Sequence, residues 1–207
     1  MIKKQNLNNK KSKEILFLYP GSFKPPHIGH FSIIETILEK YENSKIIIFI
    51  SKKDRYLPIS NIPISASFSK KLWEKWISFL PSSNKNKIQI KIAYFPSPIM
   101  DVVYYAKKYK KNHIHNIVYF IKSSKNKEDN RFKKIIEQDK NFKEWIIEPI
   151  YPEIHSRDIR QKINEIERMN EKEFLKYFKY FFFYEKKNKI GEFYKLFSNY
   201  FSNFIKK

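Results

Sequence analysis

The sequence predicts an α/β fold, a doubly wound parallel sheet of about five strands with a helical, aromatic C-terminal extension. The first of several short apolar runs, "ILFLY", is ended by Pro-Gly, as expected for a strand buried on both faces. Segments with apolar residues at helical spacing separate these runs. Strands that alternate with helices imply right-handed βαβ crossovers and a mainly parallel sheet. With 207 residues, 42% of them hydrophobic, the chain can bury such a core.

Five strands and four helices of the sheet domain follow from the pattern. Continuous or alternating apolar residues place the strands at 15–19, 45–51, 87–95, 116–122 and 145–150. Apolar residues three and four apart place the helices at 30–41, 65–80, 97–109 and 129–138. Pro58 and Pro63 interrupt the pattern after the second strand and predict a loop there.

After about residue 165 the sequence becomes rich in aromatic residues and lysine. One helical face carries Phe193, Phe197, Tyr200, Phe201 and Phe204. Such helices would cap the sheet domain or join copies of the chain in a homo-oligomer, and the alternative is a basic aromatic helix lying on a membrane surface. We therefore expect three parts, which are a basic tail at 1–14, a main domain at 15–165 and a helical extension at 166–207.

The formal net charge of +21 has two explanations. Clustered cations release counterions from phosphate backbones, which would favour a nucleic-acid partner. However, the positive residues are spread along the whole chain. Lys, Asn, Ile, Phe and Tyr are also abundant while Gly and Ala are few, as in proteins from AT-rich genomes. The composition therefore predicts at most a weak affinity for nucleic acids.

The chain has no cysteine, which excludes disulfides, thiolate nucleophiles and cysteine-based metal sites. A reducing compartment is therefore expected, and we predict a cytoplasmic protein. The first fourteen residues lack the apolar segment of a secretory signal. The longest apolar runs, such as "IIIFI" at 46–50, are far shorter than the roughly 20 residues of a membrane-spanning helix.

The stretch "YPGSFKPPHIGH" has the residues of a phosphate-handling loop. It lies between the first strand and the first helix, where open α/β sheets bind their ligands. Gly21 lets the backbone approach a ligand, and Gly29 keeps the helix start uncrowded. His27 and His30 project from one face of that helix start, whose N–H groups favour phosphate. Lys24 adds a positive charge, so the loop predicts an electrophilic pocket for phosphoryl oxygens.

These residues resemble a known family. "GSFKPPHIGH" is similar to the GxFxPxHxGH signature of the HxGH nucleotidyltransferase superfamily, which includes nicotinamide-mononucleotide (NMN) and pantetheine-phosphate adenylyltransferases and several cytidylyltransferases. "IHSRDIR" at 154–160 resembles its second signature, ISSTxIR, but His155 and Arg157 stand where the family has small hydroxyl residues. The resemblance covers about residues 15–165 and implies a Rossmann-like fold.

By position, the resemblance implies a role for each matching residue. His27 and His30 would contact the nucleotide phosphates, and His30 would stabilise the pentacoordinate transition state. Arg160 would hold the β- and γ-phosphates, and Ser156 would cap its helix. Contacts with the nucleotide or the acceptor are also expected for several residues of the two motifs, namely Gly21, Ser22, Phe23, Gly29 and Ser156.

Three further residues are expected near the acceptor. Lys52 or Lys53, just after the second strand, would match a lysine that binds a substrate phosphate. Asp101 lies in a segment that shapes the acceptor pocket in such enzymes. The loop at 122–129 is expected near the ribose or the base. Solvated loops without a ligand are the alternative for all of these.

The reaction implied is attack by a phosphate oxygen of the acceptor on the α-phosphorus of a nucleoside triphosphate, with loss of pyrophosphate. Mg²⁺ would bridge the triphosphate and keep most of its waters, so no metal-binding residue is assigned. Lys24, in place of an acid before the first proline, favours ATP as donor, with NMN as the leading acceptor. The alternatives are a cytidylyltransferase of the same superfamily, or a non-catalytic nucleic-acid-binding protein on this fold.

Overall fold

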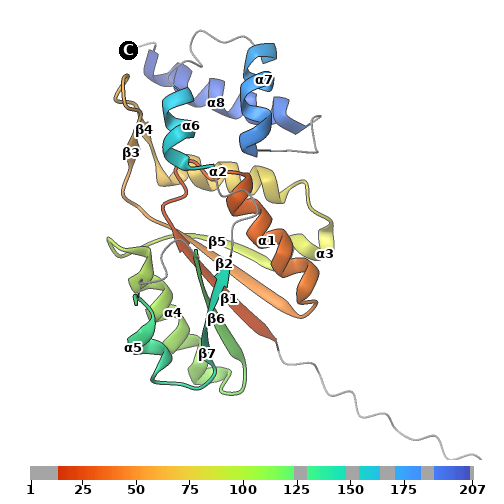
Figure 1. The fold of residues 1–207 in the computed structure, drawn as a ribbon, viewed down its shortest axis with the longest axis vertical. Helices are drawn as coiled ribbons and strands as arrows, with labels where there is room; N and C mark the ends of the chain where they lie inside the picture. Colours follow the sequence, from red (N-terminus) through yellow and green to blue (C-terminus); the bar gives the residue numbers. More distant parts are fainter. Residues whose placement is uncertain (1–13, 124–129, 148–153, 164–170, 183–188, 206–207) are drawn as a thin grey trace, which may run out of the picture.

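The computed structural model describes residues 14–123, 130–147, 154–163, 171–182 and 189–205 (Figure 1). Five parallel strands form the main sheet in the order β5-β2-β1-β6-β7. Their bounds are β1 Ile15–Gly21, β2 Ser44–Ile50, β5 Ile88–Ile92, β6 Ile117–Ser123 and β7 Phe142–Ile147. The predicted α/β fold with about five parallel strands is confirmed.

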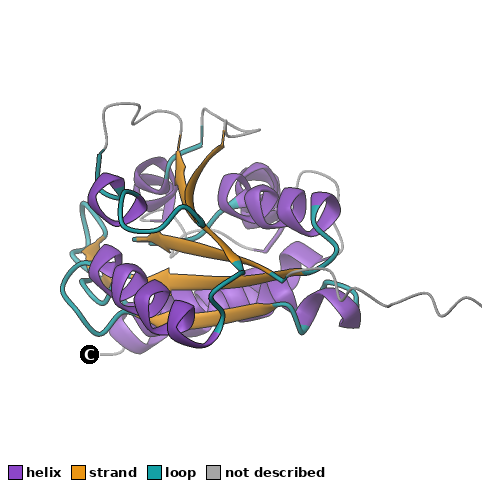
Figure 2. Cartoon of the chain, turned by 90° about the horizontal axis from the view of Figure 1, so that it is seen from below, coloured by secondary structure: helices purple, strands orange, loops and turns teal. Residues whose placement is uncertain are grey.

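Helices cover both faces of this sheet (Figures 1 and 2). On one face lie α1 (Ile28–Lys40) and α2 (Ala66–Ile77), and on the other lie α4 (Pro98–Asn112) and α5 (Lys133–Ile136). Each face has its own hydrophobic cluster, because successive side chains of a strand point to opposite faces. Phe17 belongs to the cluster under α1, and the neighbouring Leu18 belongs to the cluster under α4. This explains why the central strands are continuous apolar runs.

Some predicted elements differ in the structure. The helix expected at 129–138 is only the single turn of α5, because its few apolar residues fit one turn as well as a longer helix. The last strand begins at Phe142, before the expected start. The loop expected after the second strand contains an antiparallel hairpin of β3 (Arg55–Tyr56) and β4 (Pro63–Ile64). A short helix, α3 (Ser82–Lys85), follows α2.

The C-terminal extension forms α7 (Glu171–Phe182) and α8 (Ile190–Ile205), which pack against α1 and α2 (Figure 1). Tyr200 of α8 stacks on Phe68 of α2 with 3.9 Å between the ring centroids, and its hydroxyl donates to the Pro63 carbonyl oxygen at 2.7 Å. The cluster under α1 also buries Phe178, Phe182, Phe193, Phe197 and Phe201. Most of the aromatic face of α8 is therefore turned toward the sheet domain, as expected for capping helices, while Phe204 is exposed.

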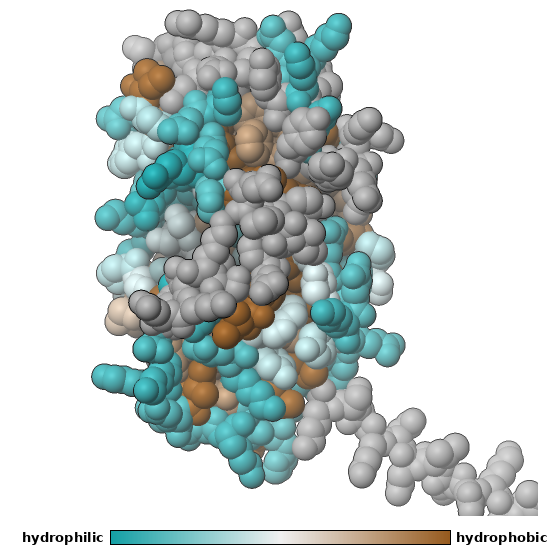
Figure 3. Space-filling view, viewed as in Figure 1, coloured by the Kyte–Doolittle hydropathy of each residue, from teal (hydrophilic) through white to brown (hydrophobic). Residues whose placement is uncertain are grey.

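The outer surface agrees with the even spread of charge in the sequence. In Figure 3, hydrophilic side chains cover much of the coloured surface, with hydrophobic ones between them in small patches. None of the described helices is long and apolar enough to cross a membrane. Nearly all of the tail predicted at 1–14 lies outside the described residues.

Candidate active site

The loop at 22–27 follows the carboxyl end of β1, where the order of the sheet reverses. β1 pairs with β2 on one side and with β6 on the other, and the helices that follow these two neighbours lie on opposite faces. Ligands of doubly wound sheets bind at such a switch point. α1 begins here, and the N-terminus of a helix attracts anions.

Phe23 turns inward at the start of this loop. Its backbone φ is 51°, and its side chain is only 3% exposed. The ring centroid lies 4.9 Å from that of Tyr19, 5.0 Å from that of His30 and 5.4 Å from that of Trp73, each in an edge-on contact. Phe23 therefore supports the His30 ring. The sequence predicted that Phe23 contacts the nucleotide. In the structure, its ring instead fills the core between β1, α1 and α2.

His27 and His30 form a capping box at the start of α1. The His27 Nδ1 accepts a hydrogen bond from the Gly29 N–H at 3.2 Å, and the His30 Nδ1 accepts one from the His27 N–H at 3.2 Å. The two ring centroids are 3.8 Å apart. Because both Nδ1 atoms accept, each neutral ring carries its proton on Nε2. The helix start therefore holds two imidazole N–H donors.

Both imidazoles are neutral at physiological pH. Burial lowers the pKa of His27 well below its usual value, and the neighbouring His30 and His155 lower it further. Burial also lowers the pKa of His30, to about 3. Two imidazolium ions this close would repel each other, which acts in the same direction. The pair is therefore suited to donate hydrogen bonds to phosphoryl oxygens without a charge of its own.

The depressed pKa of His27 predicts that acid destabilises the protein. As the pH falls through about 6.5, the unfolded chain takes up a proton at His27 and the folded chain does not. The free energy of unfolding then falls by up to ~1.4 kcal/mol per pH unit. Urea unfolding at pH 7.5 and at pH 5.0 should show this loss. His27→Asn keeps an N-cap acceptor, and between the two pH values its free energy of unfolding should fall by about 2 kcal/mol less than that of the wild type. An equal loss in the variant would contradict the depressed pKa.

Lys24 is fully buried, and its ammonium group binds the neighbouring β2–β3 loop. The Nζ atom donates to the Lys53 carbonyl oxygen and lies 3.8 Å from the Asp54 carboxylate. Burial lowers the pKa of Lys24 to about 8, although Asp54 acts to raise it. The sequence predicted that Lys24 contacts phosphoryl oxygens. In the structure, its ammonium group binds the β2–β3 loop instead, because a buried ammonium needs hydrogen-bonding or charged partners. Lys24 thus fastens the β1–α1 loop to the β2–β3 loop.

The helix α6 (Ser156–Ile163) is fastened to the same loop. The Ser156 hydroxyl donates to the Pro25 carbonyl oxygen at 2.9 Å, and the Arg160 guanidinium donates to the Lys24 carbonyl oxygen at 2.6 Å. Ser156, predicted to cap this helix, is instead its first helical residue, and its hydroxyl is used by the loop. The two sequence motifs, more than 130 residues apart, thus meet at the start of α1.

The family follows from a comparison of the whole sequence. The sequence model described as cytidylyltransferase-like matches residues 18–162, which is well over half of the 207 residues. The chain belongs to the cytidylyltransferase-like family. The match spans both motifs, so the resemblance to the HxGH nucleotidyltransferase superfamily is confirmed. A search of the curated proteins by sequence found no match.

Solved structures share the fold of this cytidylyltransferase-like chain. A bifunctional NMN adenylyltransferase/ADP ribose pyrophosphatase from Francisella tularensis, complexed with AMP and a manganese ion, is 16% identical with a TM-score of 0.56. The match covers 90% of this chain and 52% of that one, so this chain spans about half of its length. A Plasmodium falciparum nicotinic acid mononucleotide adenylyltransferase complexed with APC is 16% identical, with a TM-score of 0.54 and coverage of 90% and 98%. At this identity the matches show the fold.

The residues expected near the acceptor make backbone contacts in this cytidylyltransferase-like protein. Lys52 donates to the Tyr94 carbonyl oxygen at 2.7 Å. The Asp101 carboxylate accepts the N–H of Tyr94 at 2.9 Å and that of the next residue at 3.0 Å. The Lys53 side chain is exposed, and its carbonyl oxygen accepts the buried ammonium described above. Lys52 and Asp101 therefore fix the turn after β5, and their contact with an acceptor stays a prediction.

The remaining expected residues line the loop itself. Gly21 and Ser22 are partly exposed, and Gly29 is buried in the first turn of α1. Their predicted contacts with a nucleotide stay predictions. The loop expected near the ribose at 122–129 lies outside the described residues from 124 onward.

Asp54 and Arg55 belong to this region although no motif marks them. Asp54 is the partner of the buried Lys24, and Arg55 begins the β3–β4 hairpin. In the sequence, only their position could have indicated a role in the site. They follow the carboxyl end of a predicted strand, where the ligand-binding residues of an α/β sheet lie. Nothing in the sequence shows which of the four charged residues in "KKDR" faces the site.

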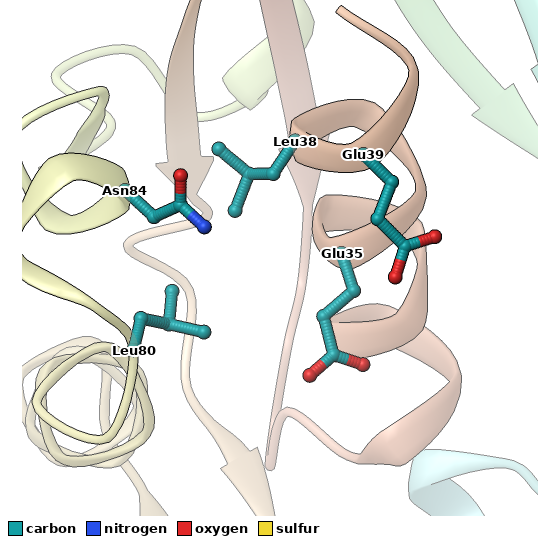
Figure 4. Close-up of a pocket in the computed structure, with 5 residues that line it drawn as sticks. All are labelled: Glu35, Leu38, Glu39, Leu80 and Asn84. Atoms are coloured by element: carbon teal, nitrogen blue, oxygen red, sulfur yellow. The ribbon is translucent and has the colours of Figure 1, made fainter. Parts of the chain in front are cut away.

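A pocket of about 190 Å³ lies near the other end of α1 (Figure 4). It is lined by Glu35, Leu38, Glu39, Leu80 and Asn84. At 1.5 Å per helical residue, Leu38 lies ~16 Å along the helix from His27. This distance separates the pocket from the candidate site of this cytidylyltransferase-like chain. The two glutamates of the pocket would also repel phosphate groups.

The described residues give no indication of a metal ion bound by protein side chains alone. The described part of the chain holds no group of three or more His, Cys, Asp or Glu side chains placed to bind an ion. Mg²⁺ usually keeps several waters and binds through substrate phosphates. Within the described ranges, no set of side chains is therefore placed to hold Mg²⁺ by itself.

Proposed function

We propose that this chain is a nucleotidyltransferase that moves AMP from ATP to a phosphorylated acceptor and releases pyrophosphate, with NMN as the leading acceptor. The observation that carries the proposal is the pair of neutral imidazoles at the start of α1, directly after a loop whose carbonyl oxygens bind Ser156 and Arg160 of α6. A purely structural loop would not need two histidine N–H donors beside a guanidinium at a helix N-terminus.

The chemistry needs positioning and hydrogen-bond donors but no protein nucleophile. An oxygen of the acceptor phosphate attacks the α-phosphorus, the bond from that phosphorus to the bridging oxygen breaks, and pyrophosphate leaves. His27 and His30 bind phosphoryl oxygens through Nε2–H, and His30 stabilises the charge that grows during the transfer. Arg160 has five N–H donors, so it holds the β- and γ-phosphates while it also binds the loop carbonyl. Bound through the ATP phosphates, Mg²⁺ would neutralise part of their negative charge.

Two observations support ATP and a pyridine mononucleotide over other pairs. Lys24 stands where cytidylyltransferase loops usually have an acid. The similar solved structures include NMN and nicotinic acid mononucleotide adenylyltransferases. The proposal also includes the division into 1–14, 15–165 and 166–207 and a cytoplasmic location. Homo-oligomer formation and a weak affinity for nucleic acids stay predictions.

The test is pyrophosphate release from ATP and from CTP, with Mg²⁺ and a panel of acceptors. The panel contains NMN, nicotinate mononucleotide, pantetheine phosphate, a sugar phosphate and an alcohol phosphate. We expect release with ATP and one pyridine mononucleotide. Release with CTP alone would make the protein a cytidylyltransferase. Release with no pair, from a protein that binds single-stranded nucleic acid with a steep salt dependence, would replace the proposal with a binding protein on this fold.

A further inference from the structure

We propose that Arg55 and Arg157 join Arg160 in a subsite for the pyrophosphate part of the nucleoside triphosphate, between the β3–β4 hairpin and α6. These three residues are the arginine cluster. The inference rests on the proposed function, and it adds two residues that the sequence motifs assign to no ligand.

The geometry brings the two elements together around one buried residue. The ammonium of Lys24 lies 3.8 Å from Asp54, the residue directly before Arg55. The carbonyl oxygen of the same Lys24 accepts a hydrogen bond from Arg160 at 2.6 Å. The hairpin and α6 therefore lie on either side of the β1–α1 loop, and Figure 1 shows them next to each other at one end of the molecule.

The arginine cluster carries more positive charge than its neighbours balance. Arg55 and Arg157 are exposed, and within the described ranges their side chains take part in no ion pair and no hydrogen bond. Asp54 is engaged with the buried Lys24, which leaves Asp158 as a carboxylate that attracts Arg160. Burial first, and then the like charges of Arg55 and Arg157, lower the pKa of Arg160. Such repulsion is relieved when an anion binds between the cations.

The shape of the site indicates an anion with more than one phosphate. The imidazole donors of His27 and His30 lie at the start of α1, and His155 is close enough to influence the His27 imidazole. The donors continue from there into α6 with Arg157 and Arg160. A ligand whose α-phosphate binds the histidines would extend its next phosphates to the arginine cluster. Guanidinium groups match such oxygens in pairs.

Arg157 is one of the two residues, with His155, at which this chain departs from the family signature, and the signature has a small hydroxyl residue there. An arginine reaches further than a hydroxyl and brings a full charge, and both Arg157 and Arg55 act on Arg160 as like charges. A serine at this position is a small hydroxyl residue like the threonine of the signature, and it removes the extra cation. Arg157→Ser is therefore the sharpest variant, and Arg55→Gln tests the hairpin side independently.

Isothermal titration calorimetry with inorganic pyrophosphate tests the subsite directly. We expect Arg55→Gln and Arg157→Ser each to weaken pyrophosphate binding about tenfold, the loss of one charge-assisted contact, and to leave AMP binding within about twofold. The unliganded variants should unfold at the same or a higher temperature than the wild type, because like-charge repulsion is removed. Lys111→Gln, which removes an exposed cation from the last turn of α4, should change none of these values.

Pyrophosphate affinity within about twofold of the wild type in both arginine variants would overturn the proposal. Equal weakening of pyrophosphate, inorganic phosphate and AMP would also overturn it, because the cluster would then be a general anion patch. These titrations need neither an acceptor nor turnover. The proposed transfer can therefore fail while pyrophosphate binding persists, and it can succeed while both arginine variants bind normally.

Discussion

Replacing His30 with alanine is expected to lower kcat by about 10²–10³-fold, with a much smaller change in the KM for ATP. The reason is that a donor held in a buried site acts most strongly on the charge that develops in the transition state. The His30 ring is fixed by the His27 N–H on one side and by the edge of Phe23 on another. The measurement is pyrophosphate release with the donor and acceptor found in the panel.

A second variant distinguishes a neutral donor from a charged one. His30→Gln keeps an N–H donor without an ionisable group, so its kcat should recover to within about tenfold of the wild type. With a pKa of about 3 in the free protein, His30 should add no ionisation to the pH profile of kcat/KM between pH 5 and 8. An apparent pKa near 6.5 that disappears in His30→Gln would contradict this role. His115→Ala, an exposed histidine before β6, is the matched control and should keep full activity.

The segment from β1 to α1 could be predicted because its signals are local. A buried apolar run, a Pro-Gly break and a helical repeat follow one another within 27 residues, 15–41. Each signal depends only on neighbours in sequence. The structure confirms the strand, the loop and the helix, although β1 continues through Pro20 and ends at Gly21. The same holds for α6, whose position after the last strand was predicted from its motif.

What could not be predicted depends on distant partners. A lysine in a phosphate-binding motif suggests a ligand contact, but the Lys24 ammonium is buried against a carbonyl 29 residues away. The Asp101 carboxylate likewise binds backbone N–H groups, which the sequence cannot show. The β3–β4 hairpin has strands of only two residues each, too short for a periodic pattern. Charged residues at strand ends therefore predict where a site lies better than what each of them binds.

Gly21→Ala should damage both stability and catalysis, although it adds a single methyl group. A Cβ at this position would lie 2.5 Å from the Phe23 Cζ, with two further ring carbons at 2.7 and 2.8 Å. The ring cannot easily move away, because it is held between Tyr19, Trp73 and His30. We expect a loss of about 1–3 kcal/mol in the free energy of unfolding. A displaced His30 should lower kcat about 10²-fold, measured as pyrophosphate release.

Two comparisons separate this clash from a general effect of alanine. Gly191→Ala makes the same change in the first turn of α8, where the higher helix propensity of alanine should stabilise the protein by up to ~1 kcal/mol. In a Phe23→Leu background the shorter side chain leaves room for the methyl group, so Gly21→Ala should there cost under ~1 kcal/mol. Activity should stay low in that double variant, because the His30 ring has lost the edge that supports it. Full activity in Gly21→Ala itself would show that Phe23 does not position the catalytic histidine.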